Sequence, residues 1–357
     1  METKGHVQQS RSGIYFALTA ALLFGASTPF SKILLGSNNP IVLAALLYLG
    51  SGVGLTLWWK LRRSSTNRDT QEAGLKRADL PWLAGAILSG GVVGPILLLF
   101  GLRITPASSA SLLLNLEGVF TALLAWFVFK ENFDRGIALG MTAITLGGLL
   151  LSWSGKPELS LAWGPIGIAG ACLAWGIDNN LTRRVSPGDP VQIAALKGLI
   201  AGAVNLSIAF ALGAALPNVR AIAMAAAIGF LGYGVSLTLF VLALRHIGTA
   251  RTGAYFSLAP FAGAAISIAL LHDRPTPYFL AAAALMSIGV WLHLTERHGH
   301  EHRHQSMEHE HRHSHDEHHR HHAEPELLAQ THSHWHRHEE LIHSHPHYPD
   351  VHHRHSH

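Results

Sequence analysis

The sequence contains a single cysteine, Cys172, and only 13% charged residues. One thiol excludes both a disulfide within the chain and a thiolate cluster for soft metals, so a metal site in the apolar part must use nitrogen and oxygen ligands. The nearest match to a phosphate-binding loop, Gly155-Lys156, is followed by Pro157 rather than Ser or Thr. A basic helix interleaved with aromatic residues is also missing. These absences argue against an ATP-hydrolysing enzyme and against a nucleic-acid-binding protein.

Apolar sequence is abundant, because hydrophobic residues make up 48% of the 357 residues. It is divided into ten stretches, each close to the roughly 20 residues that a helix needs to cross about 30 Å of hydrocarbon. The sequence therefore predicts an all-α integral membrane protein with ten transmembrane helices. The predicted spans are 13–35, 40–59, 80–101, 107–129, 135–153, 160–181, 190–212, 219–243, 250–271 and 276–295.

Lysine and arginine are distributed unevenly among the loops between these stretches. If the N-terminus is cytoplasmic, the inner loops carry most of them, including the pairs Arg62-Arg63 and Arg183-Arg184. Because basic residues favour the cytoplasmic side, both termini are expected in the cytoplasm. Membrane lipid is the expected surrounding, and nucleic acid is not an expected partner.

The C-terminal segment is rich in histidine. Of the 27 histidines, all but His6, His246, His272 and His293 lie at or after His298. Neutral imidazole ligates borderline metals such as Ni, Co and Zn. With few apolar residues, the segment is expected to be disordered without metal. The candidate metal ligands are His298, His300, His302, His304, His309, His311, His313, His315, His318, His319, His321 and His322.

An internal repeat relates the two halves of the apolar region. An offset of 142 residues aligns Gly101-Leu102-Arg103 with Ala243-Leu244-Arg245, and Glu131 with Asp273. Each half has five predicted helices, and since five is odd, the halves must cross the membrane in opposite directions. Such inverted repeats place a transport site near the midplane where they meet. The predicted parts are a cytoplasmic N-terminus (1–12), two repeats (13–153 and 160–295) and the histidine-rich tail (296–357).

Three segments carry a family resemblance. Residues 107–131 (ASSASLLLNLEGVFTALLAWFVFKE) resemble the end of an EamA-type repeat of the drug/metabolite transporter superfamily, and 169–187 and 248–262 resemble matching parts of the second repeat. Gly118 and Lys130 depart from residues often found in the family. The resemblance implies two inverted five-helix repeats and secondary export across a bacterial cytoplasmic membrane. With its histidine-rich tail, the chain resembles the nickel/cobalt-resistance exporters of that superfamily.

Polar residues inside the predicted spans are candidate site residues, because a charge at a helix centre costs about 3 kcal/mol on insertion scales. A central carboxylate such as Glu117 can exchange a proton for a cation, or can be a structural partner of another helix. Asp178 and Lys197 either form a structural ion pair, or Asp178 lies on the cation path and Lys197 neutralises the empty site. The candidate transport path consists of Asn115, Glu117, Asp178, Asn179, Lys197 and Asn205.

One further segment is ambiguous. Ser27, Thr28 and Pro29 either interrupt the first helix, exposing backbone groups to a cavity, or only kink it.

Three functional hypotheses follow. The first is a proton-driven exporter of Ni and Co ions, with Zn as a further candidate, whose tail captures cytoplasmic metal. It needs no tightly bound cofactor, because the metal is the substrate or the tail's ligand, and a homodimer is a candidate assembly. The second is an exporter of amino acids or other small metabolites, and the third a metal-buffering or metal-sensing membrane protein.

Overall fold

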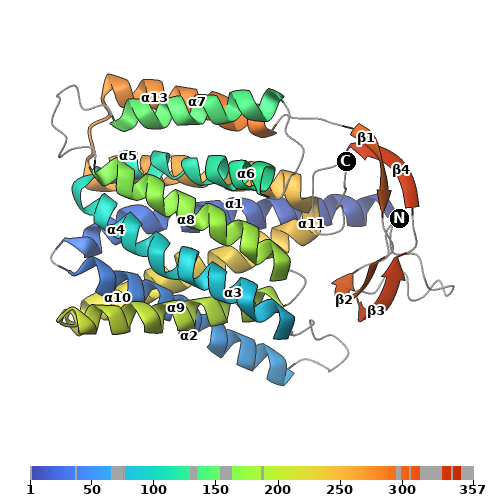
Figure 1. Cartoon of the computed structure of the whole chain (residues 1–357), viewed down its shortest axis with the longest axis horizontal. Coiled ribbons are helices and arrows are strands. Elements are labelled where there is room, and N and C mark those ends of the chain that lie inside the picture. Colours follow the sequence, from blue (N-terminus) through green and yellow to red (C-terminus); the bar gives the residue numbers. More distant parts are fainter. Residues whose placement is uncertain are drawn as a thin grey trace.

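The apolar part of the chain is a bundle of helices (Figure 1). The computed structural model describes residues 2–36, 38–65, 75, 77–128, 135–152, 163–185, 189–294, 299–304, 307–313, 332–338 and 341–346. The α-helices are α1 (Glu2–Leu35), α2 (Pro40–Ser65), α3 (Leu80–Ala86), α4 (Gly94–Ile104), α5 (Ala107–Leu113), α6 (Leu116–Phe127), α7 (Arg135–Ser152), α8 (Trp163–Val185), α9 (Pro190–Ala211), α10 (Val219–Gly229), α11 (Ser236–Phe256), α12 (Ala259–Leu271) and α13 (Pro277–Leu294).

Each predicted span overlaps one or more of these helices. Six helical segments in the described part of the chain are long and apolar enough to cross a membrane, and three shorter apolar helices accompany them. The helical bundle and its apolar composition indicate a multi-pass membrane protein. Ten crossings stay a prediction, as does the cytoplasmic location of the termini.

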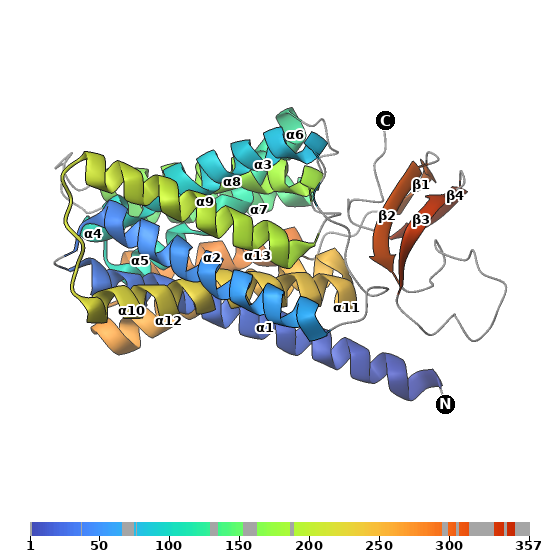
Figure 2. The same cartoon turned by 90° about the horizontal axis from the view of Figure 1, so that it is seen from below.

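The two repeats interlock. Helix α1 packs against α11 and α12, α2 against α9 and α10, and α4 against α8 (Figure 2). Each of these contacts joins a helix of the first repeat to one of the second. The interface between the repeats therefore runs through the centre of the molecule.

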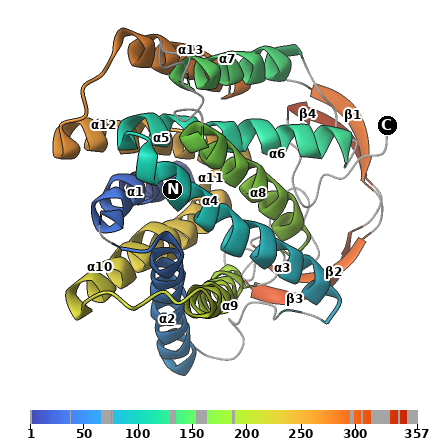
Figure 3. The ribbon, with the colours of Figure 1, turned by 60° about the vertical axis from the view of Figure 1, so that its left-hand side comes forward.

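Equivalent helices of the two repeats pack in opposite directions. Helices α7 and α13 form a pair along one edge of the bundle (Figure 3). Gly147, late in α7, lies against Met286, whereas the later Gly289 of α13 lies against the earlier Ile144. Helices α2 and α9 are also antiparallel, since Gly52 lies against Gly198 and Leu49 against Gly202. Small residues at such crossings let the backbones approach closely.

Two helices contain π-helical turns at equivalent positions of the repeats. The turn η3 (Ile87–Val93) separates α3 from α4, and η5 (Phe230–Val235) separates α10 from α11. The 142-residue offset aligns 87–93 with 229–235. The π-helical turn therefore occurs at the same position of the equivalent helix in each repeat. A π-helical turn widens the helix and leaves carbonyls without their usual donors, and it is frequent at functional sites.

A second interruption also occurs in both repeats. In the span predicted at 107–129, α5 ends at Leu113 and α6 begins at Leu116. The equivalent interruption lies between Phe256, at the end of α11, and Ala259, at the start of α12. By contrast, the possible break at Ser27–Pro29 is not present, because α1 is continuous through Pro29.

The tail differs from the expected disorder where the structure describes it. It forms β1 (Gly299–His304), β2 (Met307–His313), β3 (His332–His338) and β4 (Leu341–Pro346). Strand β1 pairs antiparallel with β4, and β2 with β3. The physical reason is the alternation of histidine with other residues, since a period of two matches a β-strand. The predicted ligands His298, His315, His318, His319, His321 and His322 lie outside the described residues.

Candidate functional site

Helix α8 carries an ion pair on one of its sides. The Lys197 Nζ of α9 lies 2.6 Å from Asp178 Oδ1 and 2.8 Å from Oδ2, and Thr182 donates to the same carboxylate at 2.7 Å. The side chains of Lys197 and Asp178 are only 15% and 10% exposed. This geometry confirms the predicted ion pair. A closed carboxylate with a bound ammonium is neutralised and is a poor candidate for a freely exchanging cation ligand.

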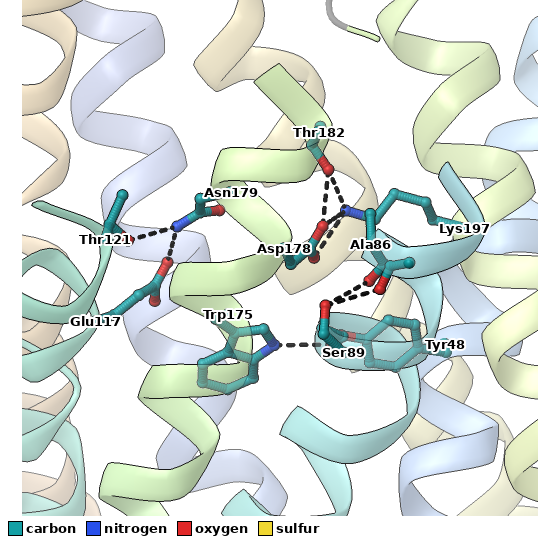
Figure 4. Close-up of polar contacts among 12 residues, drawn as sticks. Tyr48, Ala86, Ser89, Glu117, Thr121, Trp175, Asp178, Asn179, Thr182 and Lys197 are labelled. Carbon is teal, nitrogen blue, oxygen red and sulfur yellow. Dashed lines mark hydrogen bonds and ion pairs between the residues drawn. The ribbon is translucent and has the colours of Figure 1, made fainter. Parts of the chain in front are cut away.

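The other side of α8 faces a second carboxylate. Asn179 Nδ2 donates to Glu117 Oε1 at 2.8 Å and contacts Thr121 Oγ1 at 3.3 Å. In Figure 4, Asn179 extends toward Glu117 while its neighbour Asp178 extends toward Lys197. The consecutive residues Asp178 and Asn179 therefore bind two different partners, Lys197 and Glu117. Four of the six predicted site residues thus form two clusters, divided by α8: Asp178 with Lys197, and Glu117 with Asn179.

The interruption between α5 and α6 places Glu117 at the start of a helix, where a negative charge is stabilised. It lies in the first turn of α6, and its backbone N–H donates to the Leu114 carbonyl. The N-terminus of a helix favours negative charge, so this position suits a carboxylate in the membrane. The sequence placed Glu117 near the middle of a span, but it gave no sign that a new helix begins there.

The Glu117 cluster is accessible, unlike the ion pair. Glu117 is half-buried and Asn179 is exposed. A Cβ added at Gly118 would meet no atom within 4 Å. Among the described side chains around Glu117, the polar partner is an amide rather than a cation. This carboxylate can therefore take up a proton or a cation without first losing an ion pair.

A π-helical turn lies beside the ion pair. Pro95 has no N–H, so the Gly91 carbonyl, four residues earlier, lacks its normal helical donor. Asn205 Nδ2 donates to that carbonyl at 2.9 Å. The neighbouring Gly90 carbonyl accepts from Tyr48 Oη at 2.7 Å and from Trp175 Nε1 at 2.9 Å. Side chains from α2, α8 and α9 thus replace the missing backbone donors and tie both repeats to η3.

Tyr48 and Trp175 were not predicted as site residues. The available signal was Gly90-Gly91 followed by Gly94-Pro95, which predicts a weakened helix and free carbonyls. Two residues of the predicted transport path bind backbone carbonyls. Asn205 binds η3, and Asn115 Nδ2 donates to the Leu112 carbonyl at the start of the α5–α6 interruption. Both asparagines support interrupted backbone rather than the Glu117 carboxylate.

Two helix caps lie at the end of the bundle that is predicted to face outward. Lys32, from the last turn of α1, donates to the carbonyls of Leu102, Arg103 and Thr105 at the end of α4. Asp273 accepts from the Ser108 N–H at the start of α5 at 2.9 Å. A cation at a helix C-terminus and an anion at an N-terminus are both favourable.

Metal ligands do not gather in the helical body that the structure describes. Among residues with described side chains, no group of three or more His, Cys, Asp and Glu comes together. Cys172 is buried, and its thiol faces the Leu113 carbonyl at 3.6 Å. Within the predicted spans, the candidate oxygen ligands for a cation are Glu117 and its amide and hydroxyl neighbours Asn179 and Thr121.

Comparison with known proteins is consistent with this architecture. The EamA-like transporter family matches residues 11–153 and 162–295, so one copy of its repeat covers each half. The chain belongs to the EamA-like transporter family. Members of the EamA family are transporters rather than enzymes, and the chain is a membrane transporter of small substrates.

Two relatives and one solved structure are similar to the chain. An uncharacterized transporter of Methanothermobacter thermautotrophicus is 30% identical over 274 residues, covering 73% of this chain and 80% of the relative. Uncharacterized transporter YyaM of Bacillus subtilis is 27% identical over 233 residues, covering 61% of this chain and 75% of the relative. A protein of known crystal structure aligns with a TM-score of 0.59 and 17% identity, over 79% of this chain and 95% of that one. That structure supports the fold alone.

Proposed function

We propose that this EamA transporter exports divalent transition-metal cations, Ni and Co with Zn as a further candidate, in exchange for protons. The single observation that carries the proposal is the difference between its two membrane carboxylates. Asp178 is closed and neutralised by Lys197, whereas Glu117 is accessible and hydrogen-bonded to an amide. A carboxylate that holds either a proton or a cation is the simplest coupling group for antiport.

The choice of substrate rests on the tail. Imidazole is the common ligand of Ni, Co and Zn, and the tail holds most of the chain's histidines. A tethered chain can raise the local concentration of a captured ion to about the millimolar range. With both termini in the cytoplasm of a bacterium, as the positive-inside pattern predicts, capture would occur on the side from which metal is exported.

The test is transport by the purified full chain in proteoliposomes. An imposed pH gradient should drive accumulation of Ni or Co in wild-type vesicles. Glu117→Gln should abolish it, because an amide cannot exchange a proton for a cation. Glu117→Asp is the matched control, since it keeps the carboxylate and should retain measurable transport. Wild-type rates in Glu117→Gln would refute the coupling role.

A metabolite exporter is the second candidate. It is favoured by the lack of a three-ligand metal group among the described membrane side chains, and by the two charges of the Asp178–Lys197 pair, which suit a zwitterion if the pair separates during transport. The same vesicles loaded with radiolabelled amino acids separate the two substrates. Gradient-driven amino-acid flux without metal flux would favour this candidate. Metal binding without flux of either substrate would favour a metal-buffering or metal-sensing protein.

A further inference from the structure

The paired strands of the tail place histidines directly opposite one another. In the β2–β3 pair, His309 is opposite His336, His311 opposite His334 and His313 opposite His332. These three rungs alternate with others in which Glu308 is opposite Arg337 and Glu310 opposite Trp335. Because alternate residues of a strand share a face, every histidine of these rungs lies on the same face of the pair.

The second pair repeats the arrangement. In the β1–β4 pair, His300 is opposite His345 and His302 opposite His343. Glu301 is opposite Ser344 on the alternate rung between them. In both strand pairs, opposed histidines at alternate positions therefore lie on one face of the pair.

The spacing of such positions suits one metal ion. Opposite residues of an antiparallel pair have Cα atoms about 5 Å apart. Consecutive positions on one face of a strand are about 7 Å apart, twice the rise per residue. Two neighbouring rungs therefore place four histidine positions on one face, with Cα atoms close enough for one ion to be shared between them. Four nitrogen ligands suit tetrahedral Zn or Co, and imidazole also suits Ni.

We propose that the histidine face of the β2–β3 pair is a binding site for a late first-row divalent metal ion, built from two opposed histidines on each of two neighbouring rungs. His309, His311, His334 and His336 are the central set. An isolated two-stranded pair is marginally stable in water, so metal binding and strand pairing stabilise each other. This site rests on the capture role proposed above and includes histidines after His322, which are not among the candidate ligands predicted from the sequence.

The experiment measures metal binding by the metal-free full chain in detergent, with Co(II) as the probe. Tetrahedral Co(II) gives an intense visible band, whereas six-coordinate Co(II) held by scattered histidines absorbs weakly. The decisive variant exchanges three adjacent pairs in β3: His332→Ser with Ser333→His, His334→Trp with Trp335→His, and His336→Arg with Arg337→His. Composition and histidine count stay the same, but three histidines move to the other face.

The matched control makes the same kind of exchange outside the strands: His319→Arg with Arg320→His, and His322→Ala with Ala323→His. A second variant, His334→Gln with His336→Gln, removes the opposed histidines and cannot be rescued by a one-residue slip of the strand. Because the β1–β4 pair would give a band of its own, all chains compared carry His343→Gln with His345→Gln. We expect the tetrahedral band in the otherwise wild-type chain and in the control, and its loss in the second variant.

Loss of the band in the exchange variant as well supports the site. No tetrahedral band in wild type, or an unchanged band in the second variant, overturns it. These results are independent of flux, so a chain that binds Co(II) in this way but transports no metal contradicts the proposed function and leaves the site intact.

Discussion

At the scale of single residues, the two membrane carboxylates differ because their partners differ. Asp178 and Lys197 neutralise each other in a closed environment, while Glu117 at the start of α6 has only neutral hydrogen-bond partners among the described side chains. A buried ion pair adds little stability compared with an apolar pair, but losing one partner leaves an unpaired charge. The contribution of Asp178 and Lys197 to stability is therefore best tested by replacing both residues as well as each one alone.

The ion pair gives the first prediction. Lys197→Met should lower the free energy of unfolding by about 3 kcal/mol, since it leaves the Asp178 carboxylate unpaired. Asp178→Asn in addition should recover most of that loss. Thermal unfolding of the purified variants in detergent measures both. A double variant as unstable as the sum of the two single variants would show that the pair has a further structural role.

The second prediction concerns two glycines, whose replacement by alanine should change the free energy of unfolding differently. A Cβ at Gly90 would overlap the Asp178 carboxylate, so Gly90→Ala should cost about 2 kcal/mol through overpacking. Gly118→Ala meets no neighbour and should be neutral or stabilising by up to about 1 kcal/mol, because alanine favours a helix. Thermal unfolding compares the two, and an equal loss of stability would contradict the close contact at Gly90.

At the scale of elements, the interruptions in the helices bring side chains together. At the turn η3, polar side chains from three helices meet backbone carbonyls, and at the α5–α6 junction Asn115 donates to the Leu112 carbonyl. Backbone without its own helical hydrogen bonds persists in a membrane only where protein or water satisfies it. Equivalent interruptions in the second repeat show that they are properties of the repeat itself.

The third prediction concerns the two donors to Gly90. Tyr48→Phe and Trp175→Phe each leave that carbonyl with one donor, so the single losses should be small apart from lost packing. The double variant leaves a buried carbonyl unsatisfied, which costs about 1–3 kcal/mol beyond the sum. A double-mutant cycle on unfolding free energies measures this coupling, and simple additivity would argue that the carbonyl finds another donor.

At the scale of the whole molecule, the helical body and the tail have separable tasks. The body is an interlocked pair of inverted repeats with its own apolar core. The tail contributes no helix to that core in the part that the structure describes. Removing the tail should therefore leave the body folded.

Truncation after Arg297 is the fourth prediction. The shortened chain should still transport metal but with a higher apparent KM, because capture is lost while the path remains. The wild-type advantage should vanish as the pH falls through about 6, since protonated imidazole cannot bind metal. Vesicle transport at graded metal concentrations and pH values measures both effects. A truncated chain with no transport at any concentration would place the tail in the translocation path.

The sequence by itself determined the apolar segments, the two repeats and their family, and it predicted the Asp178–Lys197 pair as one of two alternatives. These follow from local composition and from a repeated order of residues, and a charge in a membrane helix must find a nearby partner. Only the tertiary structure decided that α8 separates Glu117 from the ion pair, that Tyr48 and Trp175 cap η3, and that Lys32 caps α4. These contacts join residues distant in the chain, and their geometry depends on how the helices cross.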